Sequence, residues 1–532
     1  MMKLTLKIIM QTSRKVVIEL TDLGIYRTEE PYEIWLDGKL LRRSERVVET
    51  IGDLKPDREY SLQIKNTSGE SDPLSFCTDR ELVTLNVKRF HAWGDSLHDD
   101  TAAIQAAIMA CPPGGRVYIP EGVYRVTSLF LKSGLHLDLA RGAILSGCTD
   151  RDRLPVLPGM IQSYDETTDY NLGSWEGNPL DIFSSLITGI NVSDVIITGD
   201  GVLEGNAGFD NWWEDDRAKI TAFRPRMVFL NNCKNITIHG LTIQNSPSWN
   251  LHPYFSENIR FIGLSIFNPW DSPNTDGMDP ESVNGLEVVG VHFSLGDDCI
   301  AIKSGKYYMG HKYKTPSQNL EIRQCFMQNG HGAVSIGSEM AGGVKNLHVS
   351  NCIFDHTDRG LRIKTRRGRG KDAVIEGIFF ENIRMDHVRT PFVVNSFYNC
   401  CDPDAHSDYV RSKAPLPVDD RTPAVNQLSF KNIVCHNCHA AGAFLYGLPE
   451  QKMDSVCFDH VTIDYAAEPE PMEPAMMDDL GPVSRMGIFI DNAKHLELNE
   501  ISIDGQDGAP FLIRHVDEVI YNGERKEADK IC

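Results

Sequence analysis

The chain has 532 residues, a net charge of −21 and a pI near 5.3. This length is enough for two domains, or for one large repeat domain with an accessory module. The acidic balance disfavours nucleic acid and an anionic membrane surface as partners. No stretch reaches the ~20 apolar residues that span a bilayer.

The cysteines and the first residues bear on the cellular location. The 13 cysteines are odd in number and scattered, which is not the pattern of a secreted disulfide framework. Residues 1–20 carry charges throughout and contain no apolar run of signal-peptide length. The sequence therefore predicts a cytoplasmic protein, with export by a route without a Sec signal left open. It gives no prediction of the oligomeric state.

Residues 1–84 differ in character from the rest of the chain. Three segments alternate as half-buried strands: Val16–Leu20, Tyr32–Leu36 and Tyr60–Ile64. The segment Leu54–Tyr60 resembles the tyrosine corner of a fibronectin type III domain, in which the tyrosine hydroxyl ties down a strand crossover. We expect a small β-sandwich of this kind over 1–84, with Trp35 in its core. An unrelated small β domain is the alternative.

A short helix is expected near 100–110. Ile104 and Ile108 share one helix face, and Asp99 or Asp100 can cap the N-terminus. Such a helix suits the open first coil of a β-solenoid, where an exposed end would template aggregation.

An irregular repeat follows. Apolar strands begin at Ile236, Ile259, Leu286, Leu320 and Leu347, with spacings of 23, 27, 34 and 27 residues. A second strand lies about seven residues further on in each coil, at Ile243, Ile266, Phe293, Phe326 and Phe354. The pattern predicts an all-β protein whose residues 85–532 form a right-handed parallel β-helix, with asparagines aligned as internal ladders at its corners.

Four motifs stand in order along this repeat: Asn274-Thr275-Asp276, Gly296-Asp297-Asp298, Gly330-His331-Gly332 and Arg362-Ile363-Lys364. Each motif alone is typical of a turn, but their order and spacing favour catalysis. Hydrolysis of a glycosidic bond usually needs two carboxyl groups. Carboxylates at equivalent positions on adjacent coils would lie about 5 Å apart in backbone, and such crowding raises the pKa of one of them. These residues alone do not say which carboxyl is the acid.

A basic window surrounds the last motif, with seven cations and no acid from Arg359 to Lys371. Arg362, Lys364 and Arg366 alternate, which in a strand places them on one face. An acidic enzyme needs such a local patch to hold an acidic polysaccharide. A solvated basic loop is the alternative.

The motif set resembles glycoside hydrolase family 28, the polygalacturonases and their pectin-degrading relatives, over roughly residues 85–515. The resemblance implies a parallel β-helix and inverting hydrolysis. It implies that Asp297 is the general acid, that Asp276 and Asp298 hold and activate water, and that His331 tunes the proton of the acid.

The resemblance also implies substrate-binding residues. Arg362 and Lys364 would bind the uronate carboxylate, and Tyr398 lies where the family has a substrate-contacting tyrosine. Further candidates for sugar contact, which could equally be structural, are Asn274, Trp249 and His252. We expect no cofactor and no metal. The haem-like pattern Cys435–His439 lies inside a strand-like repeat and is interpreted as structural.

Two long insertions, Lys306–Gln318 and Cys400–Pro423, together with the Arg366–Lys371 extension, resemble exo-acting members of the family. The alternative is that the insertions only decorate the outer face. The predicted function is hydrolysis of α-1,4-galacturonosidic bonds. The alternatives are a rhamnogalacturonan or modified-galacturonan hydrolase, a calcium-dependent pectate lyase, and a non-catalytic carbohydrate-binding solenoid.

Overall fold

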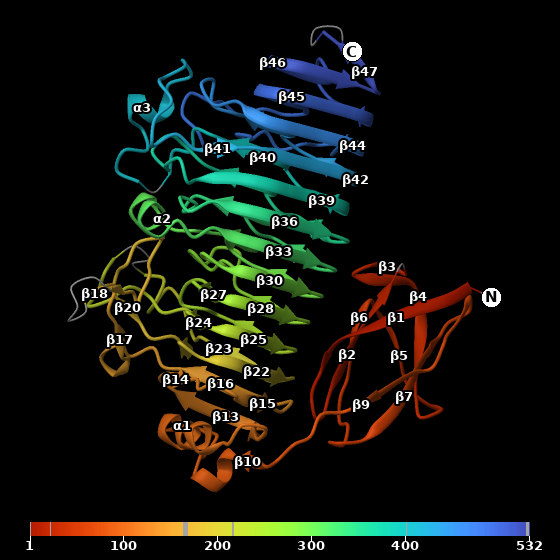
Figure 1. Ribbon diagram of the computed structural model, residues 1–532, viewed down its shortest axis with the longest axis vertical. Coiled ribbons are helices and arrows are strands. Elements are labelled where there is room, and N and C mark those ends of the chain that lie inside the picture. Colours follow the sequence, from red (N-terminus) through yellow and green to blue (C-terminus); the bar gives the residue numbers. More distant parts are fainter. Residues whose placement is uncertain are drawn as a thin grey trace.

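The structure is a computed structural model, and it describes residues 2–21, 23–162, 169–214, 218–400, 402–527 and 531. Figure 1 shows a column of stacked strands, with α1 (Thr101–Ala110) at one end and β46 (Phe511–Tyr521) at the other. A smaller β unit packs against the side of this column. Among the described residues, no helix is long and apolar enough to span a bilayer.

The small unit contains nine strands in two sheet layers around its own apolar core. In one layer β2 pairs with β1 and β6, and in the other β4 pairs with β5 and β7, which also pairs with β9. The strands are β1 (Met2–Gln11), β2 (Val16–Thr21), β3 (Gly24–Ile25), β4 (Arg27–Leu36), β5 (Lys39–Arg46), β6 (Val48–Ile51), β7 (Glu59–Lys65), β8 (Gly69–Ser71) and β9 (Leu74–Cys77).

The tyrosine-corner contact is present, because the hydroxyl of Tyr60 accepts a hydrogen bond of 2.8 Å from the backbone N–H of Lys55. The core position predicted for Trp35 is wrong. Trp35 is only half-buried, whereas Ile34 is fully buried. Since strand residues alternate, Trp35 faces away from the core and lies under the ammonium of Lys65, 5.1 Å from its ring. The likeness to fibronectin type III domains stays a prediction.

The column is a parallel β-helix, as the sequence predicts. Ile236, Ile259, Leu286, Leu320 and Leu347 are consecutive partners in register. Their strands belong to a first sheet, which contains β10 (Thr84–Asn86), β12 (Arg116–Ile119), β15 (His136–Leu139), β22 (Ser193–Gly199), β25 (Lys234–His239), β28 (Glu257–Ile262), β30 (Asn284–Val289), β33 (Ser317–Arg323), β36 (Val344–Ser350), β39 (Val374–Asp386), β42 (Gln427–Cys438), β44 (Met453–Tyr465) and β45 (Met486–Asp504).

A second sheet holds the second strand of each coil. Met327, not Phe326, pairs with Phe293 and fills the core, so the sequence placed this strand one residue out of register. Two adjacent apolar residues left the inward position ambiguous. The strands are β11 (Asp95–Asp99), β13 (Gly122–Val126), β16 (Ala143–Gly147), β23 (Val202–Glu204), β26 (Thr242–Gln244), β29 (Ser265–Phe267), β31 (His292–Ser294), β34 (Phe326–Gln328) and β37 (Ile353–Asp355).

A third sheet carries the motifs. Its strands are β14 (Leu129–Phe130), β21 (Ile187–Ile190), β24 (Val228–Asn231), β27 (Leu251–Tyr254), β32 (Ile300–Ile302), β35 (Val334–Gly337), β38 (Arg359–Lys364), β40 (Thr390–Asn395) and β43 (Ala441–Tyr446), continued by β45 and β46. Shorter elements are η1 (Val87–Phe90), η2 (Arg151–Arg153), β17 (Val156–Leu157), β18 (Ile161–Gln162), β19 (Asp169–Tyr170), β20 (Ile182–Phe183), α2 (Tyr307–Tyr313), α3 (Asp408–Arg411), β41 (Ala424–Val425) and β47 (Glu524–Lys526).

The asparagine ladders lie outside the core, not inside it as predicted. Asn258 donates to Asn235 at 3.1 Å, and Asn346 donates to Asn319 at 3.2 Å, all with exposed side chains. These asparagines have φ between 53° and 58°. Asparagine tolerates this left-handed conformation, which turns the chain at each corner and leaves the next apolar residue pointing inward.

The capping helix α1 buries Ile104 and Ile108 over the first coils. Asp100 occupies the N-cap position, but its side chain does not cap the helix, because the carboxylate accepts hydrogen bonds from the N–H groups of Trp93 and Gly94. Asp99 instead accepts from the backbone of Thr101 at 2.8 Å.

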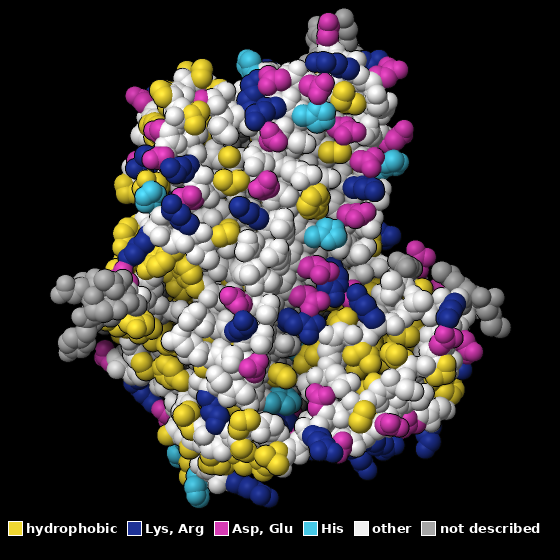
Figure 2. Space-filling model, viewed as in Figure 1, with side chains coloured by type: hydrophobic (Ala, Val, Ile, Leu, Met, Phe, Trp, Pro, Cys, Tyr) yellow, Lys and Arg dark blue, Asp and Glu magenta, His cyan; other side chains and the backbone are white. Residues whose placement is uncertain are grey.

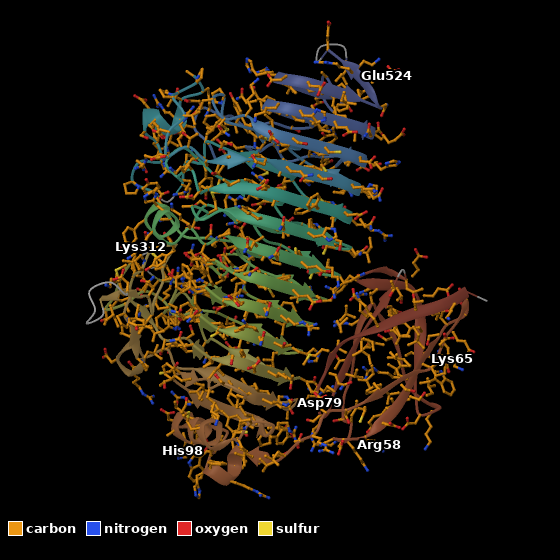
Figure 3. All side chains as sticks on the ribbon, viewed as in Figure 1. Arg58, Lys65, Asp79, His98, Lys312 and Glu524 are labelled. Carbon is orange, nitrogen blue, oxygen red and sulfur yellow. The ribbon has the colours of Figure 1, made fainter. Side chains whose placement is uncertain are left out.

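The small unit packs on the first sheet, away from the motifs. The carboxylate of Glu19 takes three hydrogen bonds of 2.9–3.1 Å from the guanidinium of Arg323, and both are buried. Val48 packs beside Ile262 and Val289 of the column. In Figure 3, Lys65 of the small unit and Lys312 of α2 lie on opposite sides of the column. The unit therefore leaves the third sheet open.

Candidate active site

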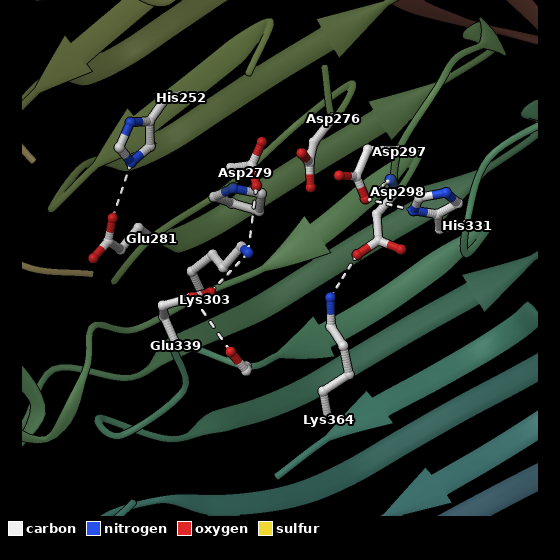
Figure 4. A network of polar contacts seen from close by, with 12 residues as sticks. His252, Asp276, Asp279, Glu281, Asp297, Asp298, Lys303, His331, Glu339 and Lys364 are labelled. Atoms are coloured by element: carbon white, nitrogen blue, oxygen red, sulfur yellow. Dashed lines mark hydrogen bonds and ion pairs between the residues drawn. The ribbon is translucent and has the colours of Figure 1, made fainter. Parts of the chain in front are cut away.

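The four motifs meet on successive coils of the third sheet. Met278, Ile300, Val334 and Leu361 are consecutive partners in register. Asp276 precedes the first of these positions, Asp297 and Asp298 precede the second, and His331 precedes the third. The Arg362-Ile363-Lys364 motif lies in β38 itself. Figure 4 shows Asp276, Asp297, Asp298, His331 and Lys364 together at one place on the column.

Three carboxylates form the centre of the site. One carboxylate oxygen from each of Asp276, Asp297 and Asp298 lies within 4.8 Å of the other two. The backbone bends just before them at Gly296, where a Cβ would lie 2.6 Å from the carbonyl oxygen of Ser272. Only glycine fits there, so this close packing aims both consecutive aspartates at the same place. We call these three residues the carboxylate trio.

Asp298 is the member of the trio that pairs with two cations. Its carboxylate oxygens lie 2.7 Å from Lys364 Nζ and 3.1 Å from Arg362 Nη1. Burial opposes ionisation of Asp298, but Lys364 and Arg362 outweigh it and lower its pKa. The Arg362 and Lys364 side chains share one face of β38, as the sequence predicts. Arg366 turns aside to bond Asp402 and Asp404.

Asp276 has the opposite character. Burial raises its pKa well above the ordinary value, and the neighbouring charge of Asp297 raises it further. Burial would also raise the pKa of Asp297, but the hydrogen bond from His331 lowers it below the ordinary value. His331 Nδ1 lies 3.2 Å from Asp297 Oδ1, and this bond raises the pKa of the imidazole. Within the trio, the pKa of Asp276 is therefore raised, whereas those of Asp297 and Asp298 are lowered.

Trp249 and His252 cannot contact a sugar, so their predicted substrate role is wrong. Trp249 is 4% exposed, and the Arg226 guanidinium lies 4.3 Å from its ring. The His252 side chain is fully buried, with Nε2 3.0 Å from Glu281 Oε2. The segment around Ser174, remote in sequence, covers both by binding Arg226 and Glu281.

Asn274 and Tyr398 lie beside the trio. Asn274 has φ 54°, and its Oδ1 accepts a hydrogen bond of 2.7 Å from Arg224, which fixes the turn before Asp276. Tyr398 is mostly buried, with Lys364 Nζ 6.0 Å from its ring centroid. Their roles in substrate contact stay predictions.

Sequence reasoning missed a group of buried charges next to the trio. Lys303 Nζ lies 2.8 Å from Glu339 Oε2 and 3.8 Å from Asp279 Oδ1, and all three residues are buried. The available signal was the run Ile300-Ala301-Ile302-Lys303, in which a charge ends an apolar strand. A buried lysine needs an acidic partner.

Sequence reasoning also missed the segment 472–479, which reaches the site from between β44 and β45. The sulfur of Met476 lies 2.8 Å from Arg362 Nη2, and the Met476 carbonyl accepts 2.7 Å from Asn395. Arg359 donates to the carbonyl of Glu473 at 2.7 Å. The signal was the long Pro- and Glu-rich stretch after Tyr465, which interrupts the coil repeat.

The two predicted insertions meet at the rim. Lys306 begins the first and lies 3.2 Å from Asp402 in the second and 3.7 Å from Glu176. The Tyr313 hydroxyl at the end of α2 accepts from Asn171 at 3.2 Å. Cys401, within the second insertion, lies outside the described residues. The insertions therefore join each other through Lys306 and Asp402.

The fold and the site together define a glycoside hydrolase built on a parallel β-helix. The model of the family described as "Glycosyl hydrolases family 28" matches residues 157–413, and that of "Rhamnogalacturonase A/epimerase, pectate lyase-like" matches residues 84–138. A "Probable polygalacturonase" of Vitis vinifera is 32% identical over 387 residues, which cover 71% of this chain and 74% of the relative. The chain belongs to glycosyl hydrolases family 28.

Other relatives agree with this membership. An "Exo-poly-alpha-D-galacturonosidase" of Dickeya chrysanthemi is 26% identical over 413 residues, which cover 69% of this chain and 67% of the relative. The family 28 exopolygalacturonase of Yersinia enterocolitica superposes with a TM-score of 0.72 and 20% identity, over 97% of this chain and 98% of that one. At this identity the superposition shows the fold alone, including its parallel β-helix.

Proposed function

We propose that this hydrolase cleaves α-1,4-galacturonosidic bonds in polygalacturonate and its oligomers, with inversion. The observation that carries the proposal is the pair of cations, Arg362 and Lys364, beside the carboxylate trio. A guanidinium fork and an ammonium suit a uronate carboxylate. The relatives named polygalacturonase and exo-poly-alpha-D-galacturonosidase support the same substrate.

The trio supplies both proton transfers. Asp297 donates its proton to the glycosidic oxygen as the bond to the anomeric carbon breaks. Asp276 and Asp298 hold the water that attacks this carbon from the opposite side and take its proton. In the free site burial raises the pKa of Asp276, whereas the hydrogen bond from His331 lowers that of Asp297, so the reactive form arises when a proton passes from Asp276 to Asp297. A bound uronate places a negative charge beside Asp297 and favours its protonated form.

We infer that the enzyme acts on chain ends. Met476 lies against Arg362, and Lys306 and Asp402 join the two insertions. Walls at this position limit how far a polymer can extend past the cations. The similar proteins include both an exo-poly-alpha-D-galacturonosidase and an endo-polygalacturonase. The inference therefore rests on the contacts of Met476 and Lys306, not on the names of relatives.

Digestion of polygalacturonate, with viscosity and reducing ends followed together, tests both statements. We expect galacturonate or a short oligomer to be released while the viscosity falls slowly. A steep viscosity fall at low hydrolysis would show internal cutting and end the chain-end inference. No release of reducing ends from polygalacturonate would favour a rhamnogalacturonan or modified galacturonan as substrate.

The acidic polysaccharide or its oligomers are the partner we propose. Figure 2 shows acidic and basic side chains interspersed over the face in view. A cytoplasmic location, where short imported oligomers would be the substrate, also remains a proposal. In its support, buried cysteines of the column such as Cys111, Cys233 and Cys299 are free thiols.

A further inference from the structure

A buried ion pair lies next to the carboxylate trio and is not used by the proposed reaction. The Lys303 and Glu339 side chains are each 6% exposed, and their charged atoms lie 2.8 Å apart. Asp279 Oδ1 lies 3.8 Å from the same ammonium, and the Trp249 ring centroid lies 4.9 Å from it. The ammonium is thus enclosed on several sides.

The register explains how Lys303 comes to face the site. In β32, Ile300 and Ile302 point into the core, so Ala301 and Lys303 point outward. Two coils later, Lys364 occupies the outward row that passes through Gly337 of β35. Figure 4 shows Lys303 on the Asp279 side of the trio and Lys364 on the Asp298 side. The trio therefore lies between two lysines.

A contribution to folding stability does not by itself explain the buried pair of Lys303 and Glu339. Taking two charges out of water costs free energy, and replacing a buried ion pair with apolar residues is often neutral or stabilising. Lys364 has an evident task, because it holds Asp298 ionised. No carboxylate of the trio pairs directly with Lys303 among the described contacts, so its charge acts on the trio through space.

We propose that Lys303 is a positioning residue that keeps Asp276 able to accept a proton from the attacking water, and that Glu339 limits how strongly it does so. This inference rests on the proposed function, which gives Asp276 its task. A cation near a buried carboxyl favours the ionised form, and an anion beside that cation weakens the effect.

Several charged groups besides Lys303 act on the ionisation of Asp276. Asp297, Asp298 and Asp279 disfavour its ionised form, whereas Lys303, Lys364 and Arg226 favour it. Burial raises the pKa of Asp276 most, and Lys303 is the strongest opposing group. Because Lys364 is paired with Asp298, removal of Lys303 should shift the titration of Asp276 most.

The test uses the two partners of one ion pair separately. Lys303→Met removes the cation, so the acidic limb of the pH–rate profile should move to higher pH by on the order of one unit. Glu339→Gln leaves the ammonium facing Asp276 and Asp279 alone, so the limb should move to lower pH. A purely structural pair would not give opposite shifts.

Asp138→Asn is the matched control, because it breaks the buried Arg116–Asp138 pair of 2.6 Å at the start of the column. We expect its limb to stay at the wild-type pH. Infrared titration of the carboxylic-acid band that Asp276→Asn removes reports the same shifts without turnover. This readout keeps the inference testable even if polygalacturonate is not the substrate.

Opposite displacements of the Asp276 titration in Lys303→Met and Glu339→Gln would support the inference. Displacements in the same direction, or an unmoved titration, would overturn it. If Lys303→Met does not fold, Glu339→Gln decides alone: a titration at lower pH supports the role, and one unchanged or at higher pH contradicts it.

Discussion

The two lysines that flank the carboxylate trio differ in how their sites are built. Lys364 belongs to a motif that is contiguous in sequence, and it shares one strand face with Arg362. The surroundings of Lys303 come from three separate coils, because its partner Asp279 lies on an earlier coil and its partner Glu339 on a later one. The Lys364 side of the site therefore follows from a local sequence pattern, whereas the Lys303 side arises only when separate coils stack.

Loss of the proton donor should have the largest effect, since it removes the reaction that both lysines serve. Asp297→Asn cannot donate a proton, and such catalysis contributes roughly 10²–10⁴ in rate. We expect kcat to fall by this range while the melting temperature stays near wild type. A variant that keeps more than about a tenth of wild-type kcat would remove Asp297 from the acid role.

Loss of the outer lysine should reduce both activity and stability. Lys364→Met leaves the buried Asp298 with one partner fewer, and breaking a buried pair costs about 3–5 kcal/mol. We expect a higher KM for oligogalacturonides and a lower denaturant midpoint. Arg362→Ala should raise KM as well.

Lys371→Met is the matched control, because Lys371 is an exposed lysine of the same basic window, paired with Asp420. Lys371→Met should change neither the KM for oligogalacturonides nor the denaturant midpoint. Unchanged kinetics in Lys364→Met would show that uronate binds elsewhere.

Excision of the wall against Arg362 should change where the polymer is cut. Residues 467–484 can be replaced by a short Gly-Ser link, because the backbone N–H groups of Ala466 and Arg485 donate to the carbonyls of the adjacent residues Cys438 and His439. We expect the folded variant to cut internally, with a faster viscosity fall per bond. Met476→Ala should do so more weakly.

The matched control for the wall is Met109→Ala on α1, an exposed methionine remote from the site. It should keep the wild-type product pattern. If the excised variant still releases only chain ends, the walls at Lys306 and Asp402 set the cleavage position instead.

Removal of divalent cations should have the smallest effect. The three carboxylates are close enough to attract a cation, but Asp298 is already paired with Lys364 and Arg362. We expect activity to survive exhaustive chelation, measured as reducing ends. Activity restored by calcium after chelation, with products that absorb in the ultraviolet, would indicate a lyase.

The sequence predicts the features that depend on local pattern. The register from Ile236 to Leu347 follows from apolar side chains that recur in every coil. The trio follows from motifs that the stacking brings to equivalent positions. The Phe326 register failed because Met327 beside it is equally apolar.

Long-range contacts account for the other failures. Trp249 and His252 have the chemistry of sugar-binding residues, but the segment around Ser174 covers them. The contact between Met476 and Arg362 joins residues that are far apart in the chain. No periodicity predicts such contacts, because they depend on where an excursion from the coil returns.

The anomeric form of the first product tests the central claim most directly. Proton NMR during digestion of polygalacturonate follows the newly formed reducing end before mutarotation. Because the trio activates water on the face opposite the leaving group, the account predicts β-galacturonate from the α-linked substrate. A first product in the α form, or one with an unsaturated end, would contradict it.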